Sequence, residues 1–160
     1  MRKVAPRLAC LWVLLGVTFA ALAGEPAAKV RIEQAWARAT PPGVQVGAAY
    51  AVISNSGGAD RLIAVESTVS ERVEIHNTSQ KEGRMQMRQV AALDIPSGGR
   101  VAFEPSGSHL MLVNLKQPLR EGEPLSMTFV FEKAGRITVQ VPVAPMGSTQ
   151  APTSDHDHHR

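Results

Sequence analysis

Residues 100–115 read RVAFEPSGSHLMLVNL, and this stretch carries the pattern that decides the fold. Two short apolar runs lie on either side of a Pro-Ser-Gly turn. In a β-strand, side chains two residues apart point to the same face. Leu110 and Leu112 are therefore expected to face a core, while His109 and Met111 project together from the opposite face. The stretch predicts two strands joined by a turn, with chemistry-bearing side chains on the outside.

The same pattern of short runs separated by Gly, Pro, Asn and Ser continues along the rest of the chain. No segment shows a convincing apolar period of 3.6 residues with helix caps, so the chain is predicted to be all-β. Regular spacing of short strands is typical of an antiparallel sandwich or barrel. The predicted strands are Val30–Ala37, Gly47–Ser54, Arg61–Glu66, Arg72–Asn77, Arg84–Val90, Arg100–Glu104, His109–Leu115, Leu125–Glu132 and Arg136–Val143.

The N-terminus has the three-part pattern of a secretory signal. Basic residues at positions 2, 3 and 7 precede an apolar run over residues 8–22, and Ala21-Leu22-Ala23 fits the small-x-small cleavage rule. We predict a signal peptide over residues 1–23 and a short leader over residues 24–29. The alternative is an uncleaved anchor, but the apolar run is shorter than the roughly 20 residues that span a bilayer. We therefore expect a periplasmic protein without stable membrane insertion after cleavage.

Charge and cysteine content exclude several classes of function. The chain has 160 residues, a length that suits one domain, and a formal net charge of +3. The three basic residues of the signal account for that excess, so binding of nucleic acid through net charge has no support. The single cysteine, Cys10, also lies in the signal. Without it, thiolate zinc sites, iron–sulfur clusters and blue-copper centres are excluded.

The candidate ligands are histidines and methionines in the predicted strands. His109 and Met111 share one face of a strand, Met85 and Met87 share a face of another, and His76 ends the strand before that pair. Soft, uncharged thioether sulfur combined with imidazole suits Cu(I) far better than Ca²⁺, Mg²⁺ or Zn²⁺. Taken singly, each methionine has an ordinary interpretation as core filler, and each histidine as a surface residue.

The spacing of these residues resembles a known family. His76, ten residues, Met87, twenty-one residues and then His109-x-Met111 match the H-x10-M-x21-H-x-M motif of the periplasmic PCu(A)C copper chaperones. The resemblance runs from about residue 32 to 143. Further segments that resemble the family are Trp36-Ala37-Arg38, Thr40-Pro41-Pro42-Gly43, Ala48-Ala49-Tyr50, Glu74-Ile75-His76, Met85-Gln86-Met87-Arg88, Ile95-Pro96-Ser97-Gly98-Gly99, Gly107-Ser108-His109-Leu110-Met111-Leu112 and Leu115-Lys116-Gln117-Pro118-Leu119.

The resemblance implies a cupredoxin-like, Greek-key β-sandwich, which we place in a single domain over residues 30–144. It implies that Cu(I) is held by the two histidines and two methionines of the motif, and Met85 is a possible alternative ligand on the same face as Met87. It also implies delivery of Cu(I) to the Cu(A) centre in subunit II of cytochrome c oxidase, often beside a Sco-like thiol protein. Trp36 and Arg38 are candidates for a supporting role. Alternation with Val30 and Ile32 would instead make Trp36 a core residue.

Residues 145–160 change in composition and are predicted to form a flexible tail. Three tail histidines, His156, His158 and His159, alternate with Asp155 and Asp157. Imidazole and carboxylate ligands suit Cu(II), Ni(II) or Zn(II) better than Cu(I). Our hypothesis is that the tail captures Cu(II), which is reduced and passed to the main site. The other interpretation is a solvated tail that binds metal only weakly.

Three other functions compete with the copper chaperone. An enzyme is not expected, because the chain has no nucleophile elbow and no HExxH motif. Copper storage or detoxification would use the same ligands without directed delivery. A metal-free adhesion or assembly module is also a common use of exported sandwiches. That last alternative predicts that Met87 and Met111 are buried in the core.

Overall fold

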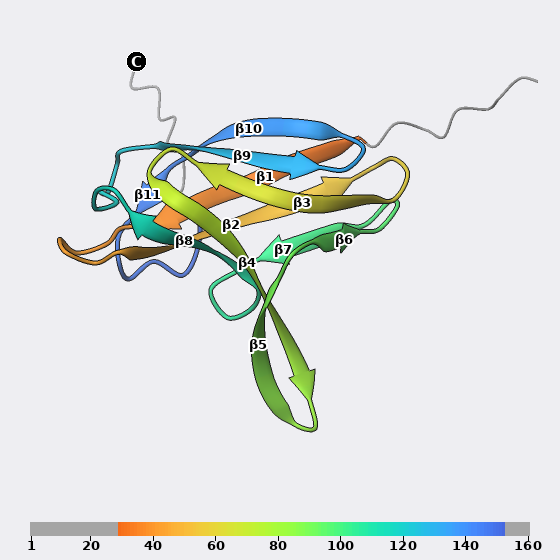
Figure 1. Ribbon diagram of the computed structural model, residues 1–160, viewed down its shortest axis with the longest axis horizontal. Coiled ribbons are helices and arrows are strands. Elements are labelled where there is room, and N and C mark those ends of the chain that lie inside the picture. The colour runs from red at the N-terminus through yellow and green to blue at the C-terminus, as the bar shows by residue number, and fades with distance from the viewer. Residues whose placement is uncertain (1–28, 153–160) are drawn as a thin grey trace, which may run out of the picture.

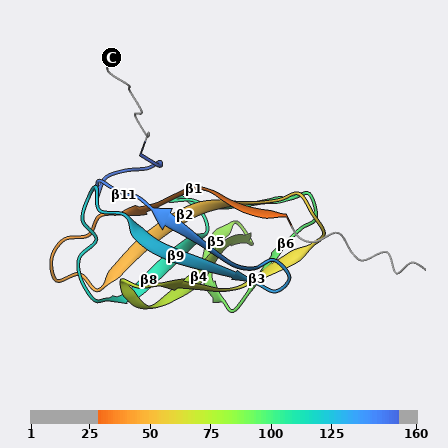
Figure 2. The same cartoon turned by 90° about the horizontal axis from the view of Figure 1, so that it is seen from above.

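The computed structural model describes residues 29–152, which form two β-sheets stacked face to face (Figures 1 and 2). Within this range the chain forms no α-helix, and so none that could cross a membrane. The predicted all-β sandwich is confirmed. The predicted signal peptide and the three tail histidines lie outside the described residues.

The larger sheet has seven strands and the smaller sheet has four. In the larger sheet the order is β11-β1-β2-β8-β4-β5, and β7 also pairs with β2; in the smaller it is β10-β9-β3-β6. The strands are β1 (Val30–Arg38), β2 (Val46–Asn55), β3 (Asp60–Ser67), β4 (Ser70–Lys81), β5 (Arg84–Val90), β6 (Leu93–Ile95), β7 (Arg100–Phe103), β8 (His109–Leu115), β9 (Leu125–Phe131), β10 (Gly135–Val141) and β11 (Val143–Ala144).

Each of the nine predicted strands is present, with two differences in how the chain is divided. The three-residue strand β6 was not predicted, because so short a run shows no alternation. The predicted strand Arg136–Val143 is divided at Pro142, which has no backbone N–H to give to a ladder. After Pro142 the chain joins the other sheet, where β11 pairs with β1 in parallel, so the pairing is not antiparallel throughout.

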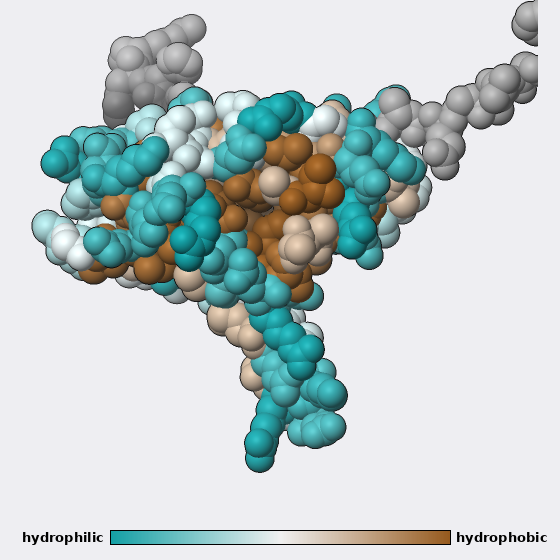
Figure 3. Space-filling view, viewed as in Figure 1, coloured by the Kyte–Doolittle hydropathy of each residue, from teal (hydrophilic) through white to brown (hydrophobic). Residues whose placement is uncertain are grey.

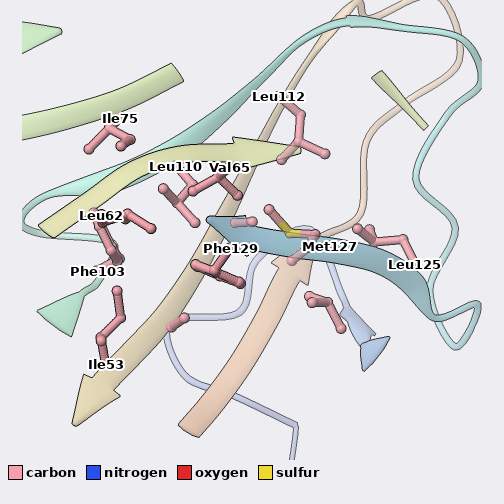
Figure 4. Close-up of a cluster of buried hydrophobic side chains, with 14 of the residues drawn as sticks. Ile53, Leu62, Val65, Ile75, Phe103, Leu110, Leu112, Leu125, Met127 and Phe129 are labelled. Atoms are coloured by element: carbon pink, nitrogen blue, oxygen red, sulfur yellow. The ribbon is translucent and has the colours of Figure 1, made fainter. Parts of the chain in front are cut away.

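The core lies between the two sheets. Leu110 and Leu112 on β8 are fully buried against side chains of the smaller sheet, among them Met127 and Phe129 (Figure 4). This confirms the prediction that the two leucines of β8 face inward. We call the opposite side of the seven-stranded sheet, which faces away from the four-stranded sheet, the outer face. It carries His109 and Met111 of β8.

A β-bulge in β1 decides which side chains of that strand reach the outer face. Glu33 pairs with Val52 and Trp36 with Tyr50, so one extra residue lies in β1 between these pairs. The bulge contains Gln34 in a left-handed conformation, with φ of 49°. Ile32 packs toward the core, but Trp36 packs on the outer face with Tyr50. Simple alternation would place Trp36 in the core, and the extra residue reverses this.

The second half of β4 leaves the body of the sandwich. Up to His76, β4 pairs with β8, whereas residues 77–81 pair only with β5. The two strands join through a two-residue turn, Glu82-Gly83, in which both φ angles are positive, as a type I′ hairpin requires. The resulting hairpin projects from the body (Figure 1) and is largely hydrophilic where it is seen in Figure 3.

Residues 145–152, the start of the predicted tail, follow a defined path beside the seven-stranded sheet. The Arg38 guanidinium donates a hydrogen bond to the backbone carbonyl of Ser148 at 2.7 Å. Ala151 packs against the cluster formed by Trp36, Tyr50 and Ala144. Residues 145–152 are therefore held beside the Trp36–Tyr50 contact.

Candidate metal site on the outer face

The register of three neighbouring strands brings the predicted ligands to one face. His76 on β4 pairs directly with His109 on β8, and on its other side with Gln89 on β5. Directly paired residues share a face, and so do residues two apart along one strand. Met111 therefore lies beside His109 on the outer face, and Met87 lies on the same face of the hairpin. The four motif residues share one surface.

The two imidazole rings form the centre of this surface. Their centroids are 5.4 Å apart, with an angle of 40° between the ring planes. Both histidines are half-buried, and 14% of the His76 side chain is exposed. The rings are close enough for both to contribute to one site, and partial exposure leaves them accessible from solvent.

Hydrogen bonds beyond the histidine pair tie the start of β8 to β4. The Thr78 hydroxyl donates to the Gly107 carbonyl at 3.0 Å, and the Thr78 backbone N–H donates to the Ser108 hydroxyl at 3.1 Å. The Ser108 hydroxyl in turn donates to the Asn77 side-chain oxygen at 2.8 Å. These contacts involve residues next to or two residues from each histidine, so they restrain the spacing of the two rings.

The methionines lie at graded distances from the histidine pair. Met111 is half-buried and pairs with Glu74 and Ala48. Met87 pairs with Thr78, one same-face step beyond His76, and is 55% exposed. Met85 is a further same-face step away and is 65% exposed. Each step along one face of a strand is about 6.7 Å, so Met87 lies nearer to the histidines than Met85.

Glu74 adds a carboxylate that sequence reasoning treated only as part of a motif. The His76 Nε2 lies 3.0 Å from Glu74 Oε2, and the Arg72 Nε donates to Glu74 Oε1 at 2.9 Å. The hydrogen bond from His76, followed by that from Arg72, lowers the pKa of Glu74. The contact could have been predicted from spacing, because Glu74 stands two residues before His76 in a predicted strand and so shares its face.

The other nitrogens of the two rings have different surroundings. The Nδ1 atom of His76 is buried and has no hydrogen-bond partner among the described residues. The Nδ1 atom of His109 lies 3.3 Å from the Gly107 carbonyl oxygen. Buried polar atoms in proteins are nearly always paired, so this nitrogen is an exception among the described residues.

The aromatic pair Trp36 and Tyr50 continues the outer face beside the histidines. The ring centroids are 4.5 Å apart, and the Arg38 guanidinium carbon lies 5.5 Å from the Tyr50 centroid and 6.0 Å from that of Trp36. Burial raises the pKa of Tyr50, and the charge of Arg38 opposes this effect. Ala49 on β2 pairs with Leu110 on β8, and the two strands are antiparallel. The next residue of β2, Tyr50, therefore lies beside the position of His109 on the outer face.

A shallow cavity of about 320 Å³ adjoins the same ligands. Its lining combines exposed apolar side chains with two of the motif residues: Arg38, Ala39, Thr40, Pro41, Val44, Val46, Gly47, Ala48, His109 and Met111. The ligands therefore border an open, mainly apolar surface. No residue of the described range belongs to a group of three or more His, Cys, Asp or Glu side chains arranged to hold a metal.

Comparison with known proteins identifies the family. A family model described as "Putative lipoprotein LpqE-like" matches residues 30–143. The chain belongs to the LpqE-like family. Among its relatives, a putative lipoprotein of Leifsonia xyli subsp. xyli is 31% identical to this chain over 141 residues, which cover 82% of this chain and 84% of the relative. An uncharacterized protein of Rickettsia prowazekii is also 31% identical, over 73% of this chain and 67% of that protein.

Solved structures similar to this LpqE-like chain are PCuAC domains. The apo PCuAC domain of PmoF2 has a TM-score of 0.68 and 32% identity, and covers 79% of this chain and 99% of that domain. The copper-bound PmoF2 domain has a TM-score of 0.64 at 32% identity, covering 74% and 95%. Cu(I)-loaded DR1885 of Deinococcus radiodurans has a TM-score of 0.60 at 26% identity, covering 78% and 83%. The predicted resemblance and cupredoxin-like fold are confirmed.

Proposed function

We propose that this protein is an exported, periplasmic copper chaperone that binds Cu(I) through His76, Met87, His109 and Met111. The direct pairing of His76 with His109 on the outer face, with Met111 beside them, is the observation that carries the proposal. Two similar PCuAC structures contain copper, one of them as Cu(I), which supports the choice of metal. The lipoprotein names of the family and of one relative support export.

The ligand set suits a carrier that must release its cargo. Two imidazoles and two thioethers are neutral, so the charge of Cu(I) remains +1 at the site. Soft sulfur ligands favour Cu(I) over hard divalent ions. Because Met87 is 55% exposed, an incoming ligand from a partner can replace it without opening the core. Stepwise ligand exchange at such a surface allows tight holding and directed release.

The exposure of the motif methionines argues against a metal-free module. That alternative expects Met87 and Met111 to fill the core, yet both lie on the outer face and Met87 is largely exposed. The methionine that does fill the core is Met127, which is 1% exposed. We therefore assign the two motif methionines to ligation rather than to packing.

For the partners we propose the Cu(A) domain of cytochrome c oxidase subunit II as acceptor and a Sco-like thiol protein acting beside the chaperone. We also propose that His156, His158 and His159 capture Cu(II) before its reduction. Both proposals extend the metal site, and each is tested apart from it. Transfer to an apo Cu(A) domain distinguishes a chaperone from a storage protein. Unchanged Cu(II) stoichiometry after removal of residues 153–160 would end the tail proposal.

The main site is tested by titrating Cu(I) into the protein in competition with a chromophoric chelator. We expect one tightly bound equivalent, lost in a Met87→Ala/His109→Ala double variant that remains folded by circular dichroism. Met146→Ala is the matched control, because Met146 is similarly exposed at 56% but lies outside the motif. Equal binding by the parent and the double variant would show that the motif is not the site.

A further inference from the structure

We propose that Glu74 is a positioning residue that holds the His76 imidazole in the tautomer whose Nδ1 atom binds the metal. The inference rests on the proposed function of the site and adds which nitrogen of each histidine faces the copper. It concerns a contact within the protein itself, so it is open to measurement without any metal.

The contact between the two side chains fixes where the proton lies. Glu74 and His76 are two residues apart on β4, so both side chains emerge on the outer face. Glu74 Oε2 lies 3.0 Å from His76 Nε2, and the two side chains are only 15% and 14% exposed. A carboxylate accepts hydrogen bonds but cannot donate them. The proton of a neutral His76 therefore resides on Nε2, and the lone pair resides on Nδ1.

Arg72 keeps Glu74 in this role. Its Nε donates to Glu74 Oε1 at 2.9 Å, which leaves Oε2 for His76. The two carboxylate oxygens of Glu74 are thus divided between the guanidinium and the imidazole. Three alternating residues of one strand thus form a chain of contacts from a guanidinium to the imidazole.

The surroundings of Nδ1 provide an independent observation. This atom is buried and has no hydrogen-bond partner among the described residues. An imidazole lone pair that no protein donor uses is available to a soft cation. Imidazoles that bind metals commonly donate their other ring N–H to a carboxylate, which fixes the ring and raises its basicity. The Glu74–His76 contact has this form.

His109 presents the opposite nitrogen. Its Nδ1 lies 3.3 Å from the Gly107 carbonyl oxygen, which only accepts hydrogen bonds. The proton of His109 is therefore on Nδ1, and its lone pair is on Nε2. The site combines Nδ1 of His76 with Nε2 of His109, and a carboxylate orients one ring while a backbone carbonyl orients the other.

The test is long-range ¹H–¹⁵N NMR of the full metal-free chain at a pH at which both imidazoles are neutral. We expect His76 to carry its proton on Nε2 in the parent and to become a mixture of tautomers in Glu74→Ala and Glu74→Gln. Glu71→Gln is the matched control, since Glu71 lies on the same strand but contacts Asn114. A proton on Nδ1 of His76 in the parent, or the same tautomer in Glu74→Ala, overturns the proposal.

Cu(I) binding provides the second readout. The Glu74→Ala variant should lose roughly 10- to 100-fold in Cu(I) affinity while remaining folded, as is typical when the orienting partner of a ligand is removed. In the loaded parent, the ¹⁵N shift should change most at Nδ1 of His76. A change centred on Nε2 would show that copper displaces Glu74, which also overturns the proposal. A parent that binds no Cu(I) would refute the proposed function, and the metal-free tautomer would still decide the role of Glu74.

Discussion

The two faces of strand β8 follow the same backbone and have opposite surroundings. Leu110 and Leu112 point inward and are fully buried among side chains of the smaller sheet (Figure 4). His109 and Met111 point outward, are half-buried, and border an open cavity. Burial selects the inner side chains for volume and apolar surface. The outer side chains contribute little to the core, so core packing does not restrict which residue types occupy these positions.

This difference predicts that stability and metal binding can be separated within one strand. Substitutions on the inner face should lower the free energy of unfolding, and substitutions on the outer face should lower Cu(I) affinity. The predictions below test this separation, in order of decreasing expected effect.

Leu112→Ala should have the largest effect. Removing a fully buried leucine side chain leaves a cavity, which typically lowers the free energy of unfolding by about 2–5 kcal/mol. Met111→Ala, on the adjacent outer position, should lower it by less than about 1 kcal/mol. Urea denaturation of both variants provides the measurement. Similar losses in the two variants would mean that Met111 is a packing residue, and would contradict the difference between the two faces of β8.

Asp60→Asn tests a buried polar group that is not a ligand. Asp60 Oδ1 accepts from the backbone N–H groups of Arg61 and Lys133, and Oδ2 accepts from that of Ala134. Asparagine would place an N–H₂ group against one of these donors. We expect a loss of about 1–3 kcal/mol in the free energy of unfolding near neutral pH, with Cu(I) affinity unchanged.

The effect of Asp60 should depend on pH in a definite direction. Burial acts to raise the pKa of Asp60, but the hydrogen bonds from the backbone N–H groups of Lys133, Arg61 and Ala134 lower it. The net result is a pKa below the ordinary value of 3.8. The stabilisation is therefore complete above about pH 3.8 and disappears as the pH falls through the lower, folded-state pKa. Urea unfolding of parent and Asp60→Asn at several acidic pH values should show their difference shrinking. A difference that grows toward acid would contradict the assignment.

Met87→Leu and Met85→Leu sharpen the assignment of the thioether ligand. Leucine keeps the apolar bulk and removes the sulfur. Met87 is one same-face step from His76 and Met85 is two, so we expect Met87→Leu to weaken Cu(I) binding by roughly 10-fold, or about 1.4 kcal/mol. Met85→Leu should change it by less than about 3-fold. The competitive chelator titration distinguishes the two, and a larger loss in Met85→Leu would show that the hairpin bends to bring Met85 to the site.

Gln34→Gly should have the smallest effect. Gln34 has a φ of 49° in the bulge of β1, and a left-handed conformation costs glycine less than other residues. The greater backbone entropy of glycine in the unfolded chain offsets part of this gain. We expect the free energy of unfolding to rise by no more than about 1 kcal/mol, with Cu(I) affinity unchanged. A large loss of stability would mean that the Gln34 side chain itself holds the bulge.

Much of the fold could be predicted because strand patterns are local. The bounds of β5 and β8 agree with their predicted ranges, and the alternation in β8 correctly separated its buried and exposed side chains. The short strands β6 and β11 were not predicted as separate elements, because two or three residues carry no measurable periodicity. At Trp36 only the alternative of a core position was wrong, because one extra residue in β1 places the side chain on the outer face.

The sequence by itself determined which residues could be ligands and which of them share a face within one strand. That information is local, because side chains alternate with a period of two residues. The tertiary structure alone decided that His76 pairs with His109, that Met87 lies nearer than Met85, and that Glu74 contacts His76 with its Nδ1 left unpartnered. These relations depend on strand order, register and side-chain orientation, which are set by packing between segments far apart in the chain.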